Sequence, residues 1–203
     1  MLILAINGSP RASGSTAKLL LSTQEVFTTA GAEFVLLQVS EALTALKTPY
    51  CVVCSNPCTG KCYAGTPLAG MLALMRRADG LLIGSPVYFS TVSAQLKSFW
   101  DRTRLLRRDK ALVNVVGGAL AVGGARFGGQ ETTLRAIHDM MLCQGMTVVG
   151  DGFGEDDAGH QGVCAQDPAG SDSEGIKRAQ VLARRVAEVA GATAGLRARL
   201  RRT

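Results

Sequence analysis

Continuous apolar runs alternate along the chain with segments whose apolar residues recur at helical spacing. Runs without polar alternation are typical of strands buried on both faces of a parallel sheet. The intervening segments carry apolar residues three or four positions apart, which gives a helix one buried face. The expected strands are Leu2–Ile6, Phe34–Val39, Leu81–Gly84, Leu112–Val122 and Met146–Val149.

The helical pattern occurs in five segments. The first begins at Ser15, whose hydroxyl suits a helix N-cap, and runs to about Ala30. Alternating strands and helices predict an α/β fold, a doubly wound five-stranded parallel sheet in the order 2-1-3-4-5 with helices on both faces. The other helices are expected over Leu68–Met75, Leu96–Thr103, Gln130–Gln144 and Ile176–Ala190.

The chain of 203 residues is long enough for one domain with a sizeable core, and it contains no internal repeat. We expect a single domain over residues 1–191, followed by a solvated basic tail over 192–203. This tail supplies much of the net charge of +6. Nucleic-acid binding is disfavoured because no aromatic-interleaved basic motif accompanies the charge. The arginines of the tail are Arg197, Arg199, Arg201 and Arg202.

No run of about 18 apolar residues occurs, so a membrane-spanning helix is not expected. The apolar start, Met1–Ile6, is short and lacks a basic region before it, which indicates a strand rather than a signal peptide. These features predict a cytoplasmic protein. In that compartment the six cysteines suit metal binding, catalysis or free thiols better than disulfides.

The first expected strand leads into a hydroxyl-rich loop, residues 7–16, and then into a helix. Free N–H groups at a helix N-terminus suit a phosphate. The spacing fits neither the P-loop nor the dinucleotide-binding glycine pattern, so a terminal monophosphate such as that of FMN is the better fit. The alternative is a flexible loop with a simple N-cap, for which one hydroxyl would be enough. The predicted phosphate ligands are Ser9, Arg11, Ser13, Ser15 and Thr16.

Two further loops follow the third and fourth strands, at the edge where ligands bind in such sheets. The first offers aromatic surface to an isoalloxazine ring, and the second is rich in glycine, so its backbone N–H groups can approach a flat ring. Such donors stabilise negative charge on a reduced flavin. Aromatic residues that only cap the core, and a glycine hinge before a helix, are the alternatives. The predicted flavin contacts are Pro86, Val87, Tyr88 and Phe89 in the first loop and Val122, Gly123 and Gly124 in the second.

These loops resemble those of the NADPH-dependent FMN reductase family over roughly residues 1–150. The resemblance implies a flavodoxin-like fold, bound FMN, NAD(P)H as a co-substrate, and homodimers or homotetramers with active sites at subunit contacts. The segments that carry it are Gly8–Arg11, Ser15-Thr16, Gly84–Phe89, Ser93–Lys97, Asp101-Arg102, Phe127–Thr132 and Gly145–Gly150.

Four cysteines lie in the irregular segment 47–66 with the spacing Cys-x2-Cys-x3-Cys-x3-Cys. Four thiolates can hold a [4Fe–4S] cluster, and a zinc site or a redox-active loop without metal is also compatible with them. A compact cysteine motif here is similar to that of the iron–sulfur flavoproteins within the family. Their usual spacing, Cys-x2-Cys-x2-Cys followed by a longer gap, differs from this one. The predicted metal ligands are Cys51, Cys54, Cys58 and Cys62.

The sequence thus predicts an FMN-dependent oxidoreductase that transfers electrons between a reduced donor, NAD(P)H or ferredoxin, and a small-molecule or protein acceptor. FMN accepts two electrons as hydride and releases them singly, so a cluster beside it would serve one-electron partners. A cluster-free NAD(P)H-dependent flavin or quinone reductase and a non-enzymatic carrier or redox sensor are the alternatives. Hydride transfer to flavin needs no protein nucleophile, so no catalytic residue is predicted.

Overall fold

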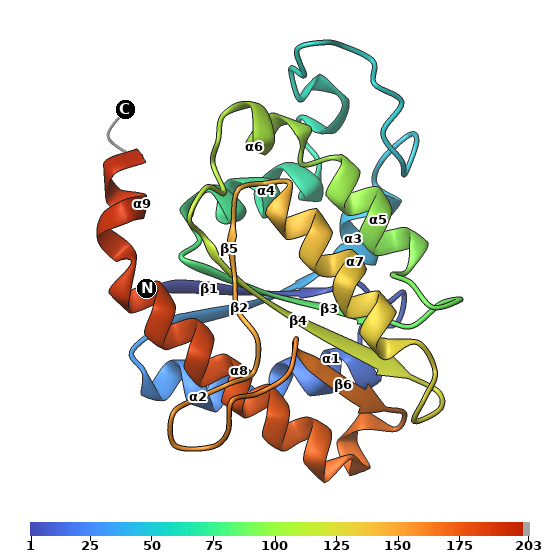
Figure 1. The fold of residues 1–203 in the computed structure, drawn as a ribbon. Helices are drawn as coiled ribbons and strands as arrows, with labels where there is room; N and C mark the ends of the chain where they lie inside the picture. Colours follow the sequence, from blue (N-terminus) through green and yellow to red (C-terminus); the bar gives the residue numbers. More distant parts are fainter. Residues whose placement is uncertain (201–203) are drawn as a thin grey trace.

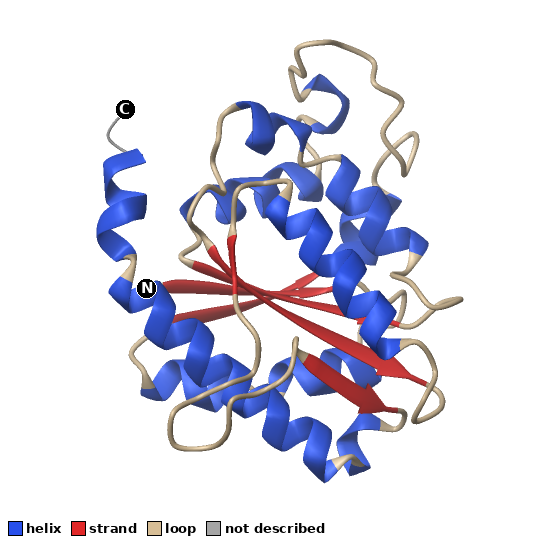
Figure 2. Cartoon of the chain, in the orientation of Figure 1, coloured by secondary structure: helices blue, strands red, loops and turns tan. Residues whose placement is uncertain are grey.

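The computed structural model describes residues 1–200, which form a central sheet covered by helices on both faces (Figures 1 and 2). All strand pairs are parallel, and the sheet has the predicted order β2-β1-β3-β4-β5, with a sixth strand that also pairs with β4. The fold is therefore the predicted flavodoxin-like α/β fold. The strands are β1 (Leu2–Asn7), β2 (Glu33–Gln38), β3 (Gly80–Pro86), β4 (Val116–Gly123), β5 (Thr147–Val148) and β6 (Val163–Gln166).

The central strands are buried on both faces, which is why their sequences run apolar without alternation. Every residue of β1 and β4 is buried. The helices α1, α2 and α8 pack on one face, and α3, α4, α5 and α7 pack on the other (Figure 1). No helix in the described part of the chain has the length and apolar content needed to cross a bilayer. The helices are α1 (Ser15–Leu21), α2 (Gln24–Thr29), α3 (Val39–Thr44), α4 (Pro67–Arg77), α5 (Ala94–Asp101), α6 (Arg104–Arg108), α7 (Gln130–Leu142), α8 (Ser173–Ala192) and α9 (Ala194–Leu200), with 3-10 turns η1 (Lys61–Tyr63) and η2 (Ala169–Ser171).

The fifth position of the sheet is shared by two short strands. β5 pairs with the beginning of β4, at Val116 and Gly117, and β6 pairs with its end, from Leu120 to Gly123. The chain leaves the sheet between them and returns, so the fifth strand is interrupted rather than continuous. The sequence analysis missed β6 because it has four residues and alternates buried with exposed positions, unlike the inner strands.

Two element boundaries differ from the prediction. The first helix is divided into α1 and α2 because the Ser22 and Thr23 hydroxyls donate to the carbonyl oxygens of Leu19 and Leu20, at 2.7 and 2.6 Å, and compete with the helical pattern. β4 starts at Val116 instead of Leu112, because the preceding residues form a turn.

The prediction that residues 192–203 form a solvated tail is also partly wrong. Arg197 lies in α9 with only 3% of its surface exposed. Its guanidinium donates to Thr193 Oγ1 at 2.8 Å and to the Ala190 carbonyl oxygen, and it pairs with Asp79 at 3.2 Å. These partners offset the cost of burying the charge. Arg201 and Arg202 lie outside the described residues.

Candidate functional site

Three loops meet at the edge of the sheet where β1, β3 and β4 end. The register pairs Asn7 with Gly84, and Pro86 with Val122, so the strand ends lie level with one another. Hydrogen bonds join the loops: the Gly8 N–H donates to the Gly84 carbonyl oxygen at 2.8 Å, and the Val87 N–H donates to the Val122 carbonyl oxygen at 2.9 Å. The fold therefore places the three loops that were predicted to bind the cofactor side by side.

The loop after β1, residues 8–14, is held by a buried polar network. The Asn7 side chain donates to Gln38 Oε1 and accepts from the Ser9 N–H at 3.1 Å. Gln38, at the end of β2, donates in turn to the Ser9 carbonyl oxygen at 2.8 Å. Both side chains are at least nine-tenths buried. Because every donor here has an acceptor, the network fixes the loop in one conformation before any ligand binds.

The predicted phosphate ligands differ in how accessible they are. Arg11 and Ser13 are exposed, whereas Ser9 and Thr16 are buried. The Ser9 hydroxyl accepts from the Arg11 N–H at 3.1 Å, and the Ser15 hydroxyl donates to the Asp167 carboxylate. The backbone amides of Ser13, Ser15 and Thr16 have no acceptor in the described part of the chain. These amides leave three N–H donors available to an anion.

The loop after β3, residues 87–92, presents aromatic side chains to the outside. Phe89 is fully exposed, at 104% of its reference area, and Tyr88 is exposed at 42%. Phe89 has φ of 49° and the next residue, Ser90, has φ of 61°, an unfavourable conformation for residues with a side chain. The Tyr88 and Thr91 backbones bond to each other in both directions, which stabilises this tight turn. The ring of Phe89 is thereby held away from the core instead of capping it.

The loop after β4 contains glycine for two different physical reasons. A Cβ on Gly123 would lie 2.4 Å from Gln130 Nε2, so a larger residue there would displace the Gln130 side chain. A Cβ on Gly124 would meet nothing within 4 Å, and Gly124 is exposed. The amides of Gly124 and Ala125 have no acceptor among the described residues. This loop therefore offers open space and free N–H donors next to the aromatic turn.

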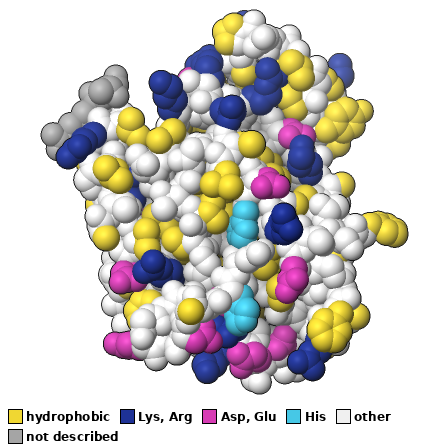
Figure 3. All heavy atoms as spheres, viewed as in Figure 1, with side chains coloured by type: hydrophobic (Ala, Val, Ile, Leu, Met, Phe, Trp, Pro, Cys, Tyr) yellow, Lys and Arg dark blue, Asp and Glu magenta, His cyan; other side chains and the backbone are white. Residues whose placement is uncertain are grey.

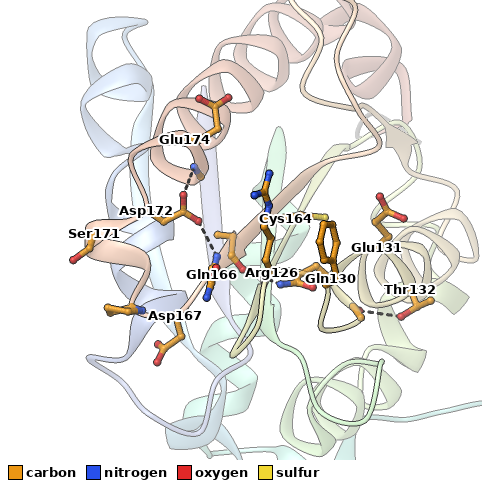
Figure 4. Close-up of a pocket in the computed structure, with 15 residues that line it drawn as sticks. Arg126, Gln130, Glu131, Thr132, Cys164, Gln166, Asp167, Ser171, Asp172 and Glu174 are labelled. Atoms are coloured by element: carbon orange, nitrogen blue, oxygen red, sulfur yellow. Dashed lines mark hydrogen bonds between the residues drawn. The ribbon is translucent and has the colours of Figure 1, made fainter.

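A cavity of about 860 Å³ lies next to these loops, between the N-termini of α7 and α8 (Figure 4). Arg126, Phe127, Cys164 and Asp172 are among the residues that line it, and Cys164 lies beside Arg126 in Figure 4. Although the residue as a whole is exposed, partial burial of the Cys164 thiol raises its pKa to about 11, and the charges of Glu131 and Asp151 add to the rise. None of the twelve predicted phosphate and flavin contacts lines this cavity, but Arg126, Phe127 and Gly129 of the loop after β4 do, and so does Asp167, the partner of Ser15.

The cysteine loop, residues 47–66, projects from the body beyond α5 and α6 (Figure 1). Lys and Arg side chains gather around this end of the molecule in Figure 3. All six cysteines are free thiols, and Cys54 and Cys62 are exposed. In the part of the chain that the structure describes, no three potential ligands are gathered closely enough to hold a metal ion. The four cysteines thus share one loop, but their sulfur atoms are not assembled into a binding geometry.

Two buried polar groups at the cysteine loop lack hydrogen-bond partners: Arg102 Nε beneath the loop and the Tyr63 hydroxyl within it. Burial raises the pKa of Tyr63 to about 12, and neighbouring Cys58 and Cys62 contribute further. Unsatisfied buried donors cost free energy, typically about 1–3 kcal/mol each. Four thiol ligands and two unused donors fit an anionic metal–sulfur group by their chemistry, although the loop must rearrange to gather the sulfurs.

Sequence reasoning missed several residues that shape the site. Asn7 and Gln38 build the loop after β1, Ser93 joins it to α5, and Gln130 holds the loop after β4 through a 2.6 Å bond to the Ala125 carbonyl oxygen. Polar side chains at the ends of buried strands were the available signal for the first two. Nothing in the local sequence marked Asp167 as a site residue, because its partner Ser15 lies 152 residues away in the chain.

Comparison with known proteins identifies the family. Residues 1–160 match the model of the NADPH-dependent FMN reductase family. An iron–sulfur flavoprotein of Methanocaldococcus jannaschii is 40% identical over 195 residues, covering 93% of this chain and 97% of the relative. An NAD(P)H dehydrogenase (quinone) of Chromohalobacter salexigens is 37% identical over 78 residues, 38% of this chain and 39% of the relative. A WrbA-like flavodoxin structure from Agrobacterium tumefaciens superimposes with a TM-score of 0.67 at 18% identity, covering 94% of this chain and 96% of that one, which shows a shared fold.

Proposed function

The chain belongs to the NADPH-dependent FMN reductase family of oxidoreductases, and we propose that it transfers electrons through FMN between NAD(P)H or ferredoxin and a small-molecule or protein acceptor. The observation that carries the proposal is the convergence of three loops at one sheet edge. There, unbonded backbone amides lie next to protruding aromatic rings. Such an edge is where α/β sheets of this kind bind their ligands.

In this proposal the loop after β1 holds the FMN phosphate. The free amides of Ser13, Ser15 and Thr16 donate to it, and exposed Arg11 supplies the positive charge. Binding through the Ser15 hydroxyl requires that hydroxyl to leave Asp167. Ser9 is buried and bonded, so its contribution is to hold the loop in shape.

The loops after β3 and β4 hold the flavin ring. Pro86, Val87, Tyr88 and Phe89 supply apolar surface on one side. Around Gly124 no side chain blocks the approach of a flat ring. Bound FMN supplies reversible uptake of hydride or of single electrons. The protein groups orient the ring, exclude water from it, and direct the Gly124 and Ala125 N–H groups toward its developing negative charge.

We propose further that Cys51, Cys54, Cys58 and Cys62 hold a [4Fe–4S] cluster. Four thiolates are the donor set of such clusters. The relative from Methanocaldococcus jannaschii is named an iron–sulfur flavoprotein and is similar over nearly its whole length. The unpartnered donors of Arg102 and Tyr63 next to the loop also support an anionic group there.

Anaerobically purified protein, assayed for FMN, iron and sulfide and then mixed separately with NADPH, NADH and reduced ferredoxin, tests both proposals. We expect stoichiometric FMN, bound iron and sulfide, and bleaching of the flavin absorbance by at least one donor. Protein that binds FMN but stays oxidised with all three donors would refute the proposed electron transfer. Flavin reduction in protein without iron would refute the cluster alone.

A cluster-free NAD(P)H-dependent quinone reductase is the second candidate, favoured by the cysteine sulfurs that are not gathered and by the partial similarity to a quinone dehydrogenase. The variant Cys54→Ser separates the two, with exposed Cys143→Ser at the end of α7 as the matched control. A cluster-dependent enzyme loses iron and ferredoxin reactivity only in Cys54→Ser. A cluster-free reductase keeps full NADPH–quinone turnover in both variants.

A further inference from the structure

Arg102 follows α5 and carries a guanidinium buried under the cysteine loop, with 4% of the residue exposed. Nη2 donates to the carbonyl oxygens of Thr48 and Tyr50, the latter at 2.7 Å. Nη1 donates to Cys62 Sγ at 3.0 Å. One side chain thus holds the residues just before the first cysteine of the motif and the sulfur of the last.

The charge of this guanidinium is not balanced by protein. Arg102 forms no ion pair among the described residues, and its Nε has no hydrogen-bond partner. A buried cation without an anion is costly, and proteins rarely retain one without a compensating group. Two carbonyl oxygens compensate only partly, because they carry partial charges. Nη1 faces the thiol group of Cys62, so negative charge on the cysteine loop would complete the balance.

We propose that Arg102 is the positioning residue and counter-cation of the cysteine loop, holding its first and last cysteines in register and balancing the negative charge of a thiolate-bound metal–sulfur group. The inference rests on the cluster proposed above. The side chain anchors both the backbone just before Cys51 and the sulfur of Cys62, and the N–H donor at Sγ stabilises charge on that sulfur. A cation at this distance favours the more negative, reduced form of the group, so it raises the reduction potential.

Arg108 provides a matched comparison. Its Nη1 also donates to the cysteine loop, at 2.6 Å to the Cys58 carbonyl oxygen. However, Arg108 has 45% of its side chain exposed and already pairs with Asp109 at 2.7 Å. It therefore contacts the loop without being a buried, unbalanced charge. Because Arg102 also makes more bonds to the loop than Arg108, loss of iron alone does not separate the two roles; the potential does, since a role limited to loop contact leaves the charge next to the sulfur without effect.

The test compares wild type with Arg102→Gln, Arg102→Lys and Arg108→Gln after anaerobic cluster reconstitution. FMN content is measured first, since the flavin loops do not include either arginine. Iron and sulfide retained after exposure to a chelator are measured next, followed by the midpoint potential of the cluster by EPR-monitored titration. We expect normal FMN in all four proteins, at least a fivefold loss of iron in Arg102→Gln, intermediate iron in Arg102→Lys, and wild-type iron in Arg108→Gln.

In the molecules that keep a cluster, we expect a lower midpoint potential in Arg102→Gln and a potential near wild type in Arg102→Lys, because only the lysine keeps the charge. Equal iron and equal potential in Arg102→Gln and Arg108→Gln would overturn the inference. Loss of FMN from Arg102→Gln would show that this variant does not fold. In that case, lower chelator resistance of the iron in Arg102→Lys than in Arg108→Gln supports the inference, and equal resistance refutes it. Wild-type protein without iron refutes the proposed cluster itself.

Discussion

The Ser93 hydroxyl donates a hydrogen bond to the Gly8 carbonyl oxygen, with 2.5 Å between Oγ and O, although 85 residues separate the two. The same Oγ accepts from the Leu96 N–H at 3.0 Å and so caps α5. One buried hydroxyl therefore couples the start of α5 to the loop that we assign to the FMN phosphate. This coupling explains how a short, glycine-containing loop keeps its shape without a ligand.

Replacing Ser93 with alanine removes both bonds at once. We expect the free energy of unfolding to fall by about 2–4 kcal/mol, the sum of a lost helix cap at about 1 kcal/mol and an unsatisfied Gly8 carbonyl at about 1–3 kcal/mol. FMN affinity is expected to fall with it, because the loop is no longer held. Urea denaturation and FMN titration measure the two effects. The control, Ser98→Ala in the same helix, should change neither, and equal behaviour of both variants would contradict the coupling.

A methyl group at Gly8 is expected to disrupt the same junction. Its Cβ would lie 2.8 Å from the Gly84 carbonyl oxygen and 2.8 Å from Leu96 Cβ, so backbone must shift. Overpacking of this kind costs about 1–3 kcal/mol. Gly8→Ala should therefore lower the melting temperature and FMN content. Gly70→Ala, in α4 with nothing within 4 Å, should instead be neutral or stabilising by about 0.5–1 kcal/mol. A Gly8→Ala protein as stable as wild type would show that the loops are not packed as described.

Phe89 offers a way to separate ligand binding from folding. Its ring is fully exposed, so removing it costs no core packing. We expect Phe89→Ala to unfold like wild type but to bind FMN about tenfold more weakly, since an aromatic contact is worth roughly 0.5–1.5 kcal/mol. Phe127, 93% exposed at the wall of the neighbouring cavity, is the matched control. A larger loss of FMN affinity in Phe127→Ala than in Phe89→Ala would move the flavin site to that cavity.

His138 predicts a pH dependence of stability. Burial lowers its pKa below the usual value near 6.5, partly offset by Asp139, and its Nε2 has no hydrogen-bond partner. The His138 imidazole therefore binds a proton more readily in the unfolded chain than in the folded protein. This contribution to stability is complete above pH about 6.5 and is lost as the pH falls below it. Between pH 7 and 5.5, His138→Gln should show a flatter decline in unfolding free energy than wild type. Parallel curves for wild type and His138→Gln would rule out His138 as the cause.

The sheet order and the positions of the cofactor loops could be predicted from the sequence because long apolar runs and glycine-rich turns report directly on buried strands and their ends. β6 was not predicted because a strand of four residues, with Cys164 and Gln166 exposed, lacks a continuous apolar run. The break between α1 and α2 depends on hydroxyl bonds of Ser22 and Thr23, which helical periodicity does not register.

The chemical type of the candidate site stays a prediction made from the residues, whereas its supporting contacts could not be predicted from them. Hydroxyls and cysteines are visible in the sequence as donors and ligands. The bonds from Ser93 to Gly8 and from Arg102 to Cys62 connect segments that only the folded chain brings together. Within the described residues, Arg102 is buried without a carboxylate partner only because of tertiary packing. Its role could therefore not be inferred from the Asp101-Arg102 sequence.

Equilibrium titration of flavin-free protein with FMN and, separately, with riboflavin, which lacks the phosphate, tests the assignment of the three loops most directly. We predict saturable FMN binding at submicromolar concentration with quenching of flavin fluorescence. Riboflavin should bind about a hundredfold more weakly, because charge-assisted bonds to the phosphate are worth roughly 1.5–3 kcal/mol each. Equal affinity for the two flavins, or no binding of either at micromolar concentration, would contradict the account.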